Sequence, residues 1–240
     1  MQSSRRASFV AGARETFPML VGAAPLGVIF GTLVTAGPLS LWHGQMLSLG
    51  VFAGSSQFIA LGLVAANAGM LVIWFTTVIV NLRHVLYAAA LLPQVAHLPW
   101  RWRWLLGFLL TDETFAVMAG YQARHGRTPL GHWYFLGSGL SMYVNWQVWT
   151  VAGLLFGASV PELKSLGLDF AMAATFIAIV VPHLSRLPHL GAALAAGLFA
   201  YLLRGLPYQL GLFAAVIVGV AVGLALTRWR TRGLARSEGL

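Results

Sequence analysis

The sequence predicts an all-helical, polytopic integral membrane protein with about eight transmembrane helices, some of them kinked or discontinuous. Of the 240 residues, 58% are hydrophobic and only 9% are charged, whereas soluble domains carry about 25% charged residues. A soluble fold with this composition would lack the polar side chains that its surface needs. Apolar runs of transmembrane length recur along the chain, and a transmembrane β-barrel would instead alternate apolar and polar residues.

The charge balance and the missing cysteines narrow the function classes. The formal net charge is +9, but the basic residues lie mainly in predicted loops and tails, as the positive-inside rule expects. We therefore predict a lipid bilayer as partner and no nucleic acid. The absence of cysteine excludes disulfides and thiolate chemistry. The histidines lack metal-site spacing, and there is no phosphate-binding glycine loop. We expect no metal, no cofactor and no built-in ATPase.

The apolar runs predict a single transmembrane domain over residues 1–240. Residues 1–16 and 228–240 are its expected N-terminal and C-terminal cytoplasmic tails. The eight runs cover residues 17–36, 42–66, 69–92, 104–121, 133–158, 167–182, 189–203 and 207–227. The seventh run is short for a full crossing. A seven-span arrangement, with one terminus outside, is the alternative.

An even number of spans places both termini on the same side of the membrane. With both termini in the cytoplasm, ten Lys and Arg residues lie inside and four lie outside, which satisfies the positive-inside rule. Arg101 and Arg103 are the weak point, because this arrangement places them in an outside loop. Trp100, Trp102 and Trp104 surround them, which suits the membrane interface on either face.

The first two spans contain features that interrupt or bend a helix. Pro25 removes a backbone donor and clashes with the preceding turn, so a kink or a break is expected there. Gly27 and Gly31 allow close helix packing. The second span carries a polar run at membrane depth, made of Gly54, Ser55, Ser56 and Gln57. These features can be packing devices between helices, or unwound backbone that faces a polar substrate.

The third span carries an ionisable residue deep in the membrane. Arg83 lies about ten residues from the Pro93 end of this span, and a charge at that depth costs between ~3 and over 10 kcal/mol. It therefore needs a partner or a water-filled cavity. Its polar neighbours on the same helix are Asn81, His84 and Tyr87. We place all four on the substrate path, although His84 could equally be a hydrogen-bonded core residue.

The fourth span supplies the countercharge. Asp112 and Glu113 follow one another, and we predict that one of them contacts Arg83 beside the polar run of the second span. Asp112 is the expected partner. Glu113 is the expected proton carrier, because an intramembrane carboxyl group can load and release a proton. The alternative is a purely structural ion pair. In the fifth span, Asn145 could line the same cavity or bond to neighbouring helices.

With these residues in view, the chain resembles the AzlC family, the larger subunit of branched-chain amino acid exporters. The resemblance runs from about residue 10 to residue 227. Its motifs are Pro25-Leu26-Gly27 with Phe30-Gly31, Phe52 to Phe58, Asn81-Leu82-Arg83-His84 with Tyr87, Thr111-Asp112-Glu113, and Asp169-Phe170 with Val181-Pro182. It implies a bacterial inner-membrane protein that exports branched-chain amino acids, driven by the proton motive force. It also implies a small, separately encoded AzlD-like membrane subunit.

The residues themselves leave three functions to compare. An amino acid exporter would bind the substrate carboxylate through Arg83 and its ammonium group through Asp112 or Glu113. Phe52, Phe58 and Phe115 would wall its apolar pocket. An intramembrane serine hydrolase would use Ser55 or Ser56 as nucleophile and His84 as base. The third function is a non-transporting accessory subunit of a membrane complex. We expect a transporter and no enzyme.

Overall fold

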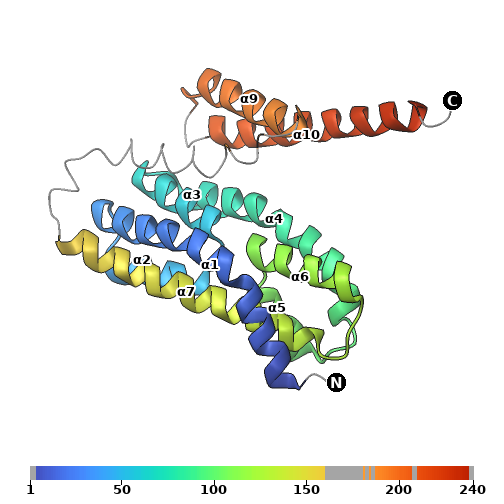
Figure 1. Cartoon of the computed structure of the whole chain (residues 1–240). Coiled ribbons are helices and arrows are strands. Elements are labelled where there is room, and N and C mark those ends of the chain that lie inside the picture. Colours follow the sequence, from blue (N-terminus) through green and yellow to red (C-terminus); the bar gives the residue numbers. More distant parts are fainter. Residues whose placement is uncertain (1–3, 160–180, 182–183, 185–186, 207–209, 238–240) are drawn as a thin grey trace. The chain divides into compact units, whose positions relative to one another are not determined.

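The computed structural model describes residues 4–159, 181, 184, 187–206 and 210–237 (Figure 1). Every regular element in this part of the chain is helical, which confirms the predicted all-α class. Contacts divide the chain into two compact units, residues 1–61 with 77–168 and residues 62–76 with 169–240. Each unit is described by itself. The predicted span over 167–182, with Asp169, lies almost entirely outside the described residues.

The N-terminal part of the chain alternates long helices with pairs of short ones. Two of the long helices, α1 and α4, are long and apolar enough to cross a membrane. The long helices are α1 (Arg5–Ala36), α4 (Met70–Val95) and α7 (Gly131–Ser159). The short pairs are α2 (Leu41–Gly50) with α3 (Gly54–Ala65), and α5 (Trp100–Phe108) with α6 (Asp112–His125).

Two predicted spans are not single helices. The apolar runs 42–66 and 104–121 each form two helices, because three residues interrupt each run, Val51–Ala53 in the first and Leu109–Thr111 in the second. This agrees with the expectation that some of the helices are discontinuous. At the first break, the Gln57 side chain donates to the Val51 carbonyl at 2.5 Å, so it satisfies an acceptor that the helix leaves open. At the second break, Thr111 caps the next helix.

The first helix is longer and more regular than predicted. It begins at Arg5 instead of residue 17, because Ser4 caps it by accepting the Ala7 N–H at 3.1 Å. The predicted N-terminal tail over 1–16 is therefore largely helical. The helix also continues through Pro18 and Pro25, so of the expected kink or break at Pro25 the break does not occur.

Helices α1 and α7 run parallel in direct backbone contact. A Cβ at Gly12 would overlap the Tyr134 carbonyl, and a Cβ at Gly31 would overlap the Thr150 carbonyl. The first half of α1 therefore contacts the first half of α7, and the second half of α1 contacts the second half of α7. The buried Thr16 hydroxyl also donates to Ser138 at 2.6 Å. Small residues thus bring the two helices closer than side chains would allow, as in many membrane helix pairs.

The second unit contains a pair of antiparallel helices, α9 (Leu187–Leu202) and α10 (Leu210–Ser237). Small residues also make this interface. A Cβ at Gly219 would lie 2.9 Å from Ala196, and one at Gly191 would overlap Leu226. Helix α10 continues well past the predicted end at residue 227, so the described part of the predicted 228–240 tail is helical.

Candidate functional site

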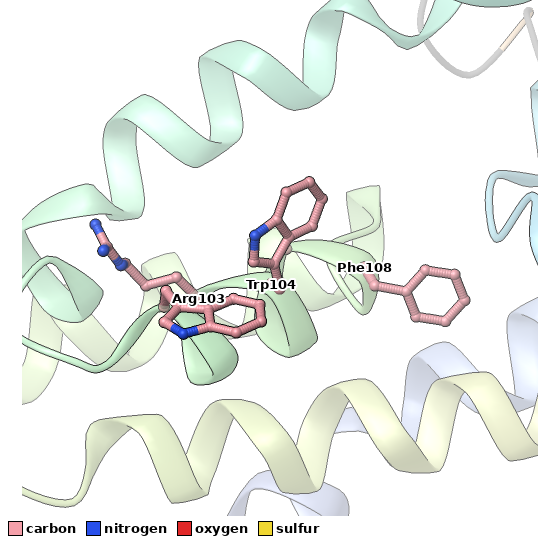
Figure 2. Close-up of a pocket in the computed structure, with 5 residues that line it drawn as sticks. Arg103, Trp104 and Phe108 are labelled. Atoms are coloured by element: carbon pink, nitrogen blue, oxygen red, sulfur yellow. The ribbon is translucent and has the colours of Figure 1, made fainter.

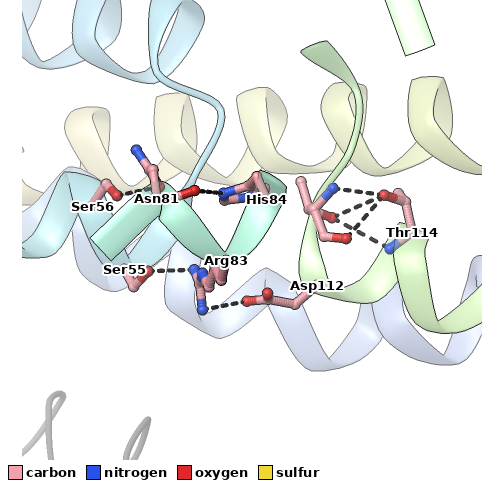
Figure 3. Close-up of polar contacts among 8 residues, drawn as sticks. Ser55, Ser56, Asn81, Arg83, His84, Asp112 and Thr114 are labelled. Atoms are coloured by element: carbon pink, nitrogen blue, oxygen red, sulfur yellow. Dashed lines mark hydrogen bonds and ion pairs between the residues drawn. The ribbon is translucent and has the colours of Figure 1, made fainter. Parts of the chain in front are cut away.

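Arg83 joins the starts of two short helices. Its guanidinium forms an ion pair with Asp112 at 2.8 Å and donates a hydrogen bond to the Ser55 hydroxyl at 2.5 Å (Figure 3). Arg83 lies at the middle of α4, Asp112 is the first residue of α6 and Ser55 is the second residue of α3. The predicted contact of Arg83 with Asp112, beside the polar run of residues 54–57, is therefore present.

The first turn of helix α6 positions Asp112. Thr111 and Thr114 form a reciprocal capping box, in which the Thr111 N–H donates to the Thr114 hydroxyl at 2.7 Å. The cap fixes the first turn of α6, which also contains Glu113. The N-terminal end of a helix carries a partial positive charge that stabilises carboxylates. Asp112 is thus held by two positive groups, the helix terminus and Arg83.

The other predicted polar residues of α4 gather at the same place. The Ser56 hydroxyl donates to the Asn81 side-chain oxygen at 2.7 Å. The His84 ring nitrogen Nδ1 lies 3.2 Å from the Asn81 carbonyl (Figure 3). Tyr87 stacks on Phe115 of α6 with ring centroids 4.4 Å apart. The site therefore combines an ion pair, a short polar chain and an aromatic wall.

The ion pair leaves hydrogen-bonding capacity unused. Arg83 Nε and Asp112 Oδ1 have no hydrogen-bond partner among the described residues. These two atoms are buried, whereas the two side chains as wholes keep 33% and 42% of their surface exposed. Glu113, next to Asp112, forms neither of the ion pairs found within the described chain. A partly exposed ion pair and one further carboxylate thus lie side by side at this site.

Three other residues predicted to lie on the substrate path, Pro25, Gly27 and Asn145, belong to the contact between α1 and α7. The Asn145 amide donates to the Leu20 carbonyl at 3.1 Å, and its oxygen accepts from Trp149 at 3.1 Å. A Cβ at Gly27 would lie 2.8 Å from Trp149. Pro25 and Asn145 line a groove of about 430 Å³ between these helices. In the described structure, this group is tied to α1–α7 packing, and no contact joins it to Arg83.

Two residues of the polar run serve the fold of the first break. Gln57 is fully buried, and its side-chain oxygen accepts from the Trp146 indole at 3.2 Å while its amide holds Val51. A Cβ at Gly54 would lie 3.2 Å from the Trp146 ring. Ser55 and Ser56, by contrast, face α4. Sequence reasoning missed Trp146, because nothing in its spacing indicates which helix faces it.

A second hollow lies along α5. It has a volume of about 520 Å³ and is lined by Trp100, Arg103, Trp104, Gly107 and Phe108. Figure 2 shows Arg103, Trp104 and Phe108 following one another along this helix. Two of the predicted pocket residues have core contacts. Phe58 packs edge-on against Phe30 at 5.7 Å, and Phe52 lies 6.3 Å from Phe108. Only Phe115 borders the Arg83 site. No metal-binding cluster occurs among the described residues.

The chain is similar to a known protein family and to several membrane proteins. The model of the family described as AzlC protein matches residues 18–160. The inner membrane protein YgaZ of Escherichia coli is 26% identical over 231 residues, which cover 93% of each chain. The branched-chain amino acid transport protein AzlC of Bacillus subtilis is 27% identical over 197 residues, covering 79% of this chain and 76% of that protein. A membrane protein of Archaeoglobus fulgidus is 29% identical over 219 residues, covering 90% and 94%.

No solved structure matches the chain. The matched region contains α2 to α7 and most of α1, and with them the whole Arg83 site. The relatives are membrane proteins, one of them named for amino acid transport. These matches support a role in membrane transport, and the chain belongs to the AzlC family.

Proposed function

We propose that this chain is the main subunit of an exporter for branched-chain or similar small apolar amino acids, coupled to the proton gradient and completed by a small AzlD-like membrane subunit. The transport class is supported by the family and by the name of the Bacillus subtilis relative. The substrate, the direction, the coupling and the partner are the proposed parts.

The observation that carries the substrate proposal is the partly exposed ion pair of Arg83 with Asp112. An amino acid brings a carboxylate and an ammonium group about as far apart as the two charges of a salt bridge. The carboxylate suits the exposed part of the Arg83 guanidinium, and the ammonium group suits the exposed part of the Asp112 carboxylate. The stacked rings of Tyr87 and Phe115 supply an apolar surface beside them for the aliphatic side chain.

Glu113 is the candidate for proton coupling. It lies beside Asp112 in the first turn of α6 but takes no part in the ion pairs of the described chain. Asp112 is paired with Arg83 at the first turn of the helix. Glu113 is therefore the acid that is free to exchange a proton while substrate binds next to it.

The experiment is efflux from cells loaded with a dipeptide that contains leucine or valine. Cells with the chain and its partner should excrete the amino acid faster than cells with Arg83→Gln. The matched control is Arg124→Gln, which removes the other ion pair of the described structure, Arg124 with Glu15. We expect a loss of at least tenfold for Arg83→Gln and less than twofold for the control. Equal efflux in all three strains contradicts the proposal.

The hydrolase alternative gains no support from the site. Both serine hydroxyls bond elsewhere, Ser55 with Arg83 and Ser56 with Asn81. The His84 ring contacts a backbone carbonyl. A serine nucleophile needs a base within hydrogen-bond reach, and the described residues show no Ser–His contact here.

A further inference from the structure

Helices α1 to α6 repeat one pattern of lengths. A long helix is followed by a four-residue connection, a short helix, a three-residue break and a second short helix. The short helices have 10 and 12 residues in the first copy and 9 and 14 in the second. At 1.5 Å per residue, each short helix is about half as long as the 30 Å membrane core. Length alone does not show whether a pair crosses the membrane or turns back.

Contacts show that the first pair turns back. Gly44 of α2 packs on Val34, near the C-terminal end of α1, and Tyr143 donates to the Leu49 carbonyl at 3.1 Å, near the middle of α7. Helix α3 then returns, because a Cβ at Gly37 would lie 3.7 Å from Leu61. The pair is a hairpin with its base at the C-terminal end of α1 and its tip at Val51–Ala53.

The second pair turns back from the opposite end. Trp102 of α5 lies 5.1 Å from Trp133, at the start of α7. Helix α5 ends at Phe108, whose ring lies 5.5 Å from Tyr143. Helix α6 then returns, because Tyr121 stacks on Tyr134 at 4.0 Å. This hairpin has its base at the N-terminal ends of α1 and α7 and its tip at Leu109–Thr111.

The two tips meet at the middle of the helix bundle. Phe52 and Phe108, from opposite tips, both pack on Tyr143, with ring centroids 5.0 and 5.5 Å away. The two rings are 6.3 Å apart. Arg83 bridges the first turns of the two returning helices through Ser55 and Asp112. Helix α4 itself runs opposite to α1, from Asn81 near the first hairpin to Gln94 near Gly126 at the end of α6.

We propose that α1–α3 and α4–α6 are inverted repeats, each made of one crossing helix and one re-entrant hairpin, whose tips meet around Arg83 at the membrane centre. Neither 42–66 nor 104–121 then crosses the bilayer. Irregular backbone at membrane depth is tolerated where protein buries it, and discontinuous helices at a repeat interface are where transporters place their substrates. This topology does not depend on the identity of the substrate.

The basic residues agree with this topology. This topology puts Arg101 and Arg103 on the side of the N-terminus and not on the expected outside, because their helix begins beside Trp133, whose ring lies 5.8 Å from the Arg5 guanidinium. One end of the bundle therefore collects Arg5, Arg6, Arg14, Arg101, Arg103, Arg124 and Arg127. The sequence from residue 16 to residue 82, which includes the opposite end, contains no charged residue. The positive-inside rule then puts the N-terminal end in the cytoplasm.

Single cysteines test the hairpins directly, because the natural chain contains none. Ala66→Cys and Ala96→Cys distinguish the two topologies. Eight full crossings place residue 66 inside and residue 96 outside, whereas the hairpins reverse both. Ser40→Cys and Ala123→Cys are the controls, outside and inside in either topology. Intact cells are treated with a membrane-impermeant maleimide before and after permeabilisation.

We expect labelling of Ser40→Cys and Ala66→Cys in intact cells, and of Ala96→Cys and Ala123→Cys only after permeabilisation. Labelling of residue 96 with protection of residue 66 overturns the hairpins. The fully reversed pattern supports the hairpins but overturns the cytoplasmic N-terminus. Any other pattern overturns the repeat. A separate failure of amino acid efflux would overturn the proposed function and leave this topology standing.

Discussion

The Arg83–Asp112 ion pair is the centre of the proposed binding site. An ionised side chain without a partner is costly in a membrane. Arg83 and Asp112 each offset this cost for the other. The pair is about one-third exposed, which means that water or substrate screens it, and its contribution to stability in detergent should be small. Its contribution to transport should be large, because it contacts the proposed substrate.

Asp112→Asn should reduce efflux by at least tenfold and lower the amount of membrane-inserted protein, because Arg83 loses its countercharge. The double variant Arg83→Gln/Asp112→Asn should regain the protein level without regaining efflux. Quantitative immunoblots of membranes, measured beside efflux, separate the two effects. Normal efflux in the double variant would show that the pair is only structural.

Glu113→Gln should leave the protein folded and able to exchange amino acids across the membrane, but unable to move them uphill. The physical reason is that the amide keeps the size of the carboxyl group and cannot carry a proton. Efflux against a gradient and equilibrium exchange are compared in membrane vesicles. Glu15→Gln is the control, since Glu15 pairs with Arg124 away from the site. Uphill transport at the normal rate in Glu113→Gln would refute the proton-coupling role.

The sequence predicts this site because its residues are costly in lipid and few in number. One internal arginine and two adjacent acids leave little choice of partner, and Asp112 is the residue found. The roles of Gln57 and Asn145 could not be predicted in the same way. Each bonds to a helix distant in the sequence, Gln57 to Trp146 and Asn145 to Leu20. Spacing along one helix does not reveal which helix lies beside it.

At the scale of helices, hydropathy predicts apolar segments but not their direction. The segments 42–66 and 104–121 are mostly apolar over a transmembrane length, yet each is divided by three residues. The sequence does contain signals for the start of the second helix in each segment. They are the polar run that begins at Gly54, and Thr111, a good N-cap residue. They show where a helix begins, whereas the fold back toward the same end follows only from tertiary contacts such as Phe30 with Phe58.

The α1–α7 contact gives a prediction for a single element. Gly31→Val should separate the helices, because its Cβ would overlap the Thr150 carbonyl and the backbone cannot move aside. Overpacking of this kind costs about 1–3 kcal/mol or more, so the melting temperature in detergent should fall by several degrees. Gly22→Val is the matched control on the same helix, since a Cβ there meets nothing within 4 Å. Equal melting temperatures for the two variants would refute the close contact.

For the whole molecule, both termini are expected in the cytoplasm. A fusion after Leu240 should therefore be active with a reporter that works in the cytoplasm and inactive with one that works in the periplasm. The described end of the chain carries Arg228 and Arg230 in α10, which the positive-inside rule also places inside. A periplasm-active reporter at this position contradicts the even number of crossings.

The partner subunit is the second prediction at this scale. Leu190, Leu194 and Leu198 of α9 form a row at four-residue spacing with 39%, 66% and 56% of their surface exposed. Such a row suits lipid or another membrane helix. Liposomes that contain the purified chain alone should transport slowly, and addition of the small subunit should raise the rate at least tenfold. Full activity of the chain alone would refute an obligate partner.

The glycine contacts of α1 and α7 have a mechanical consequence. Two helices that touch backbone to backbone at Gly12, Gly31 and the facing Gly153 cannot slide along one another, since a shift of one residue would bring a side chain into each gap. Helices α1 and α7 therefore move together as one rigid unit. If the site opens first to one side of the membrane and then to the other, the hairpins and α4 must move relative to α1 and α7.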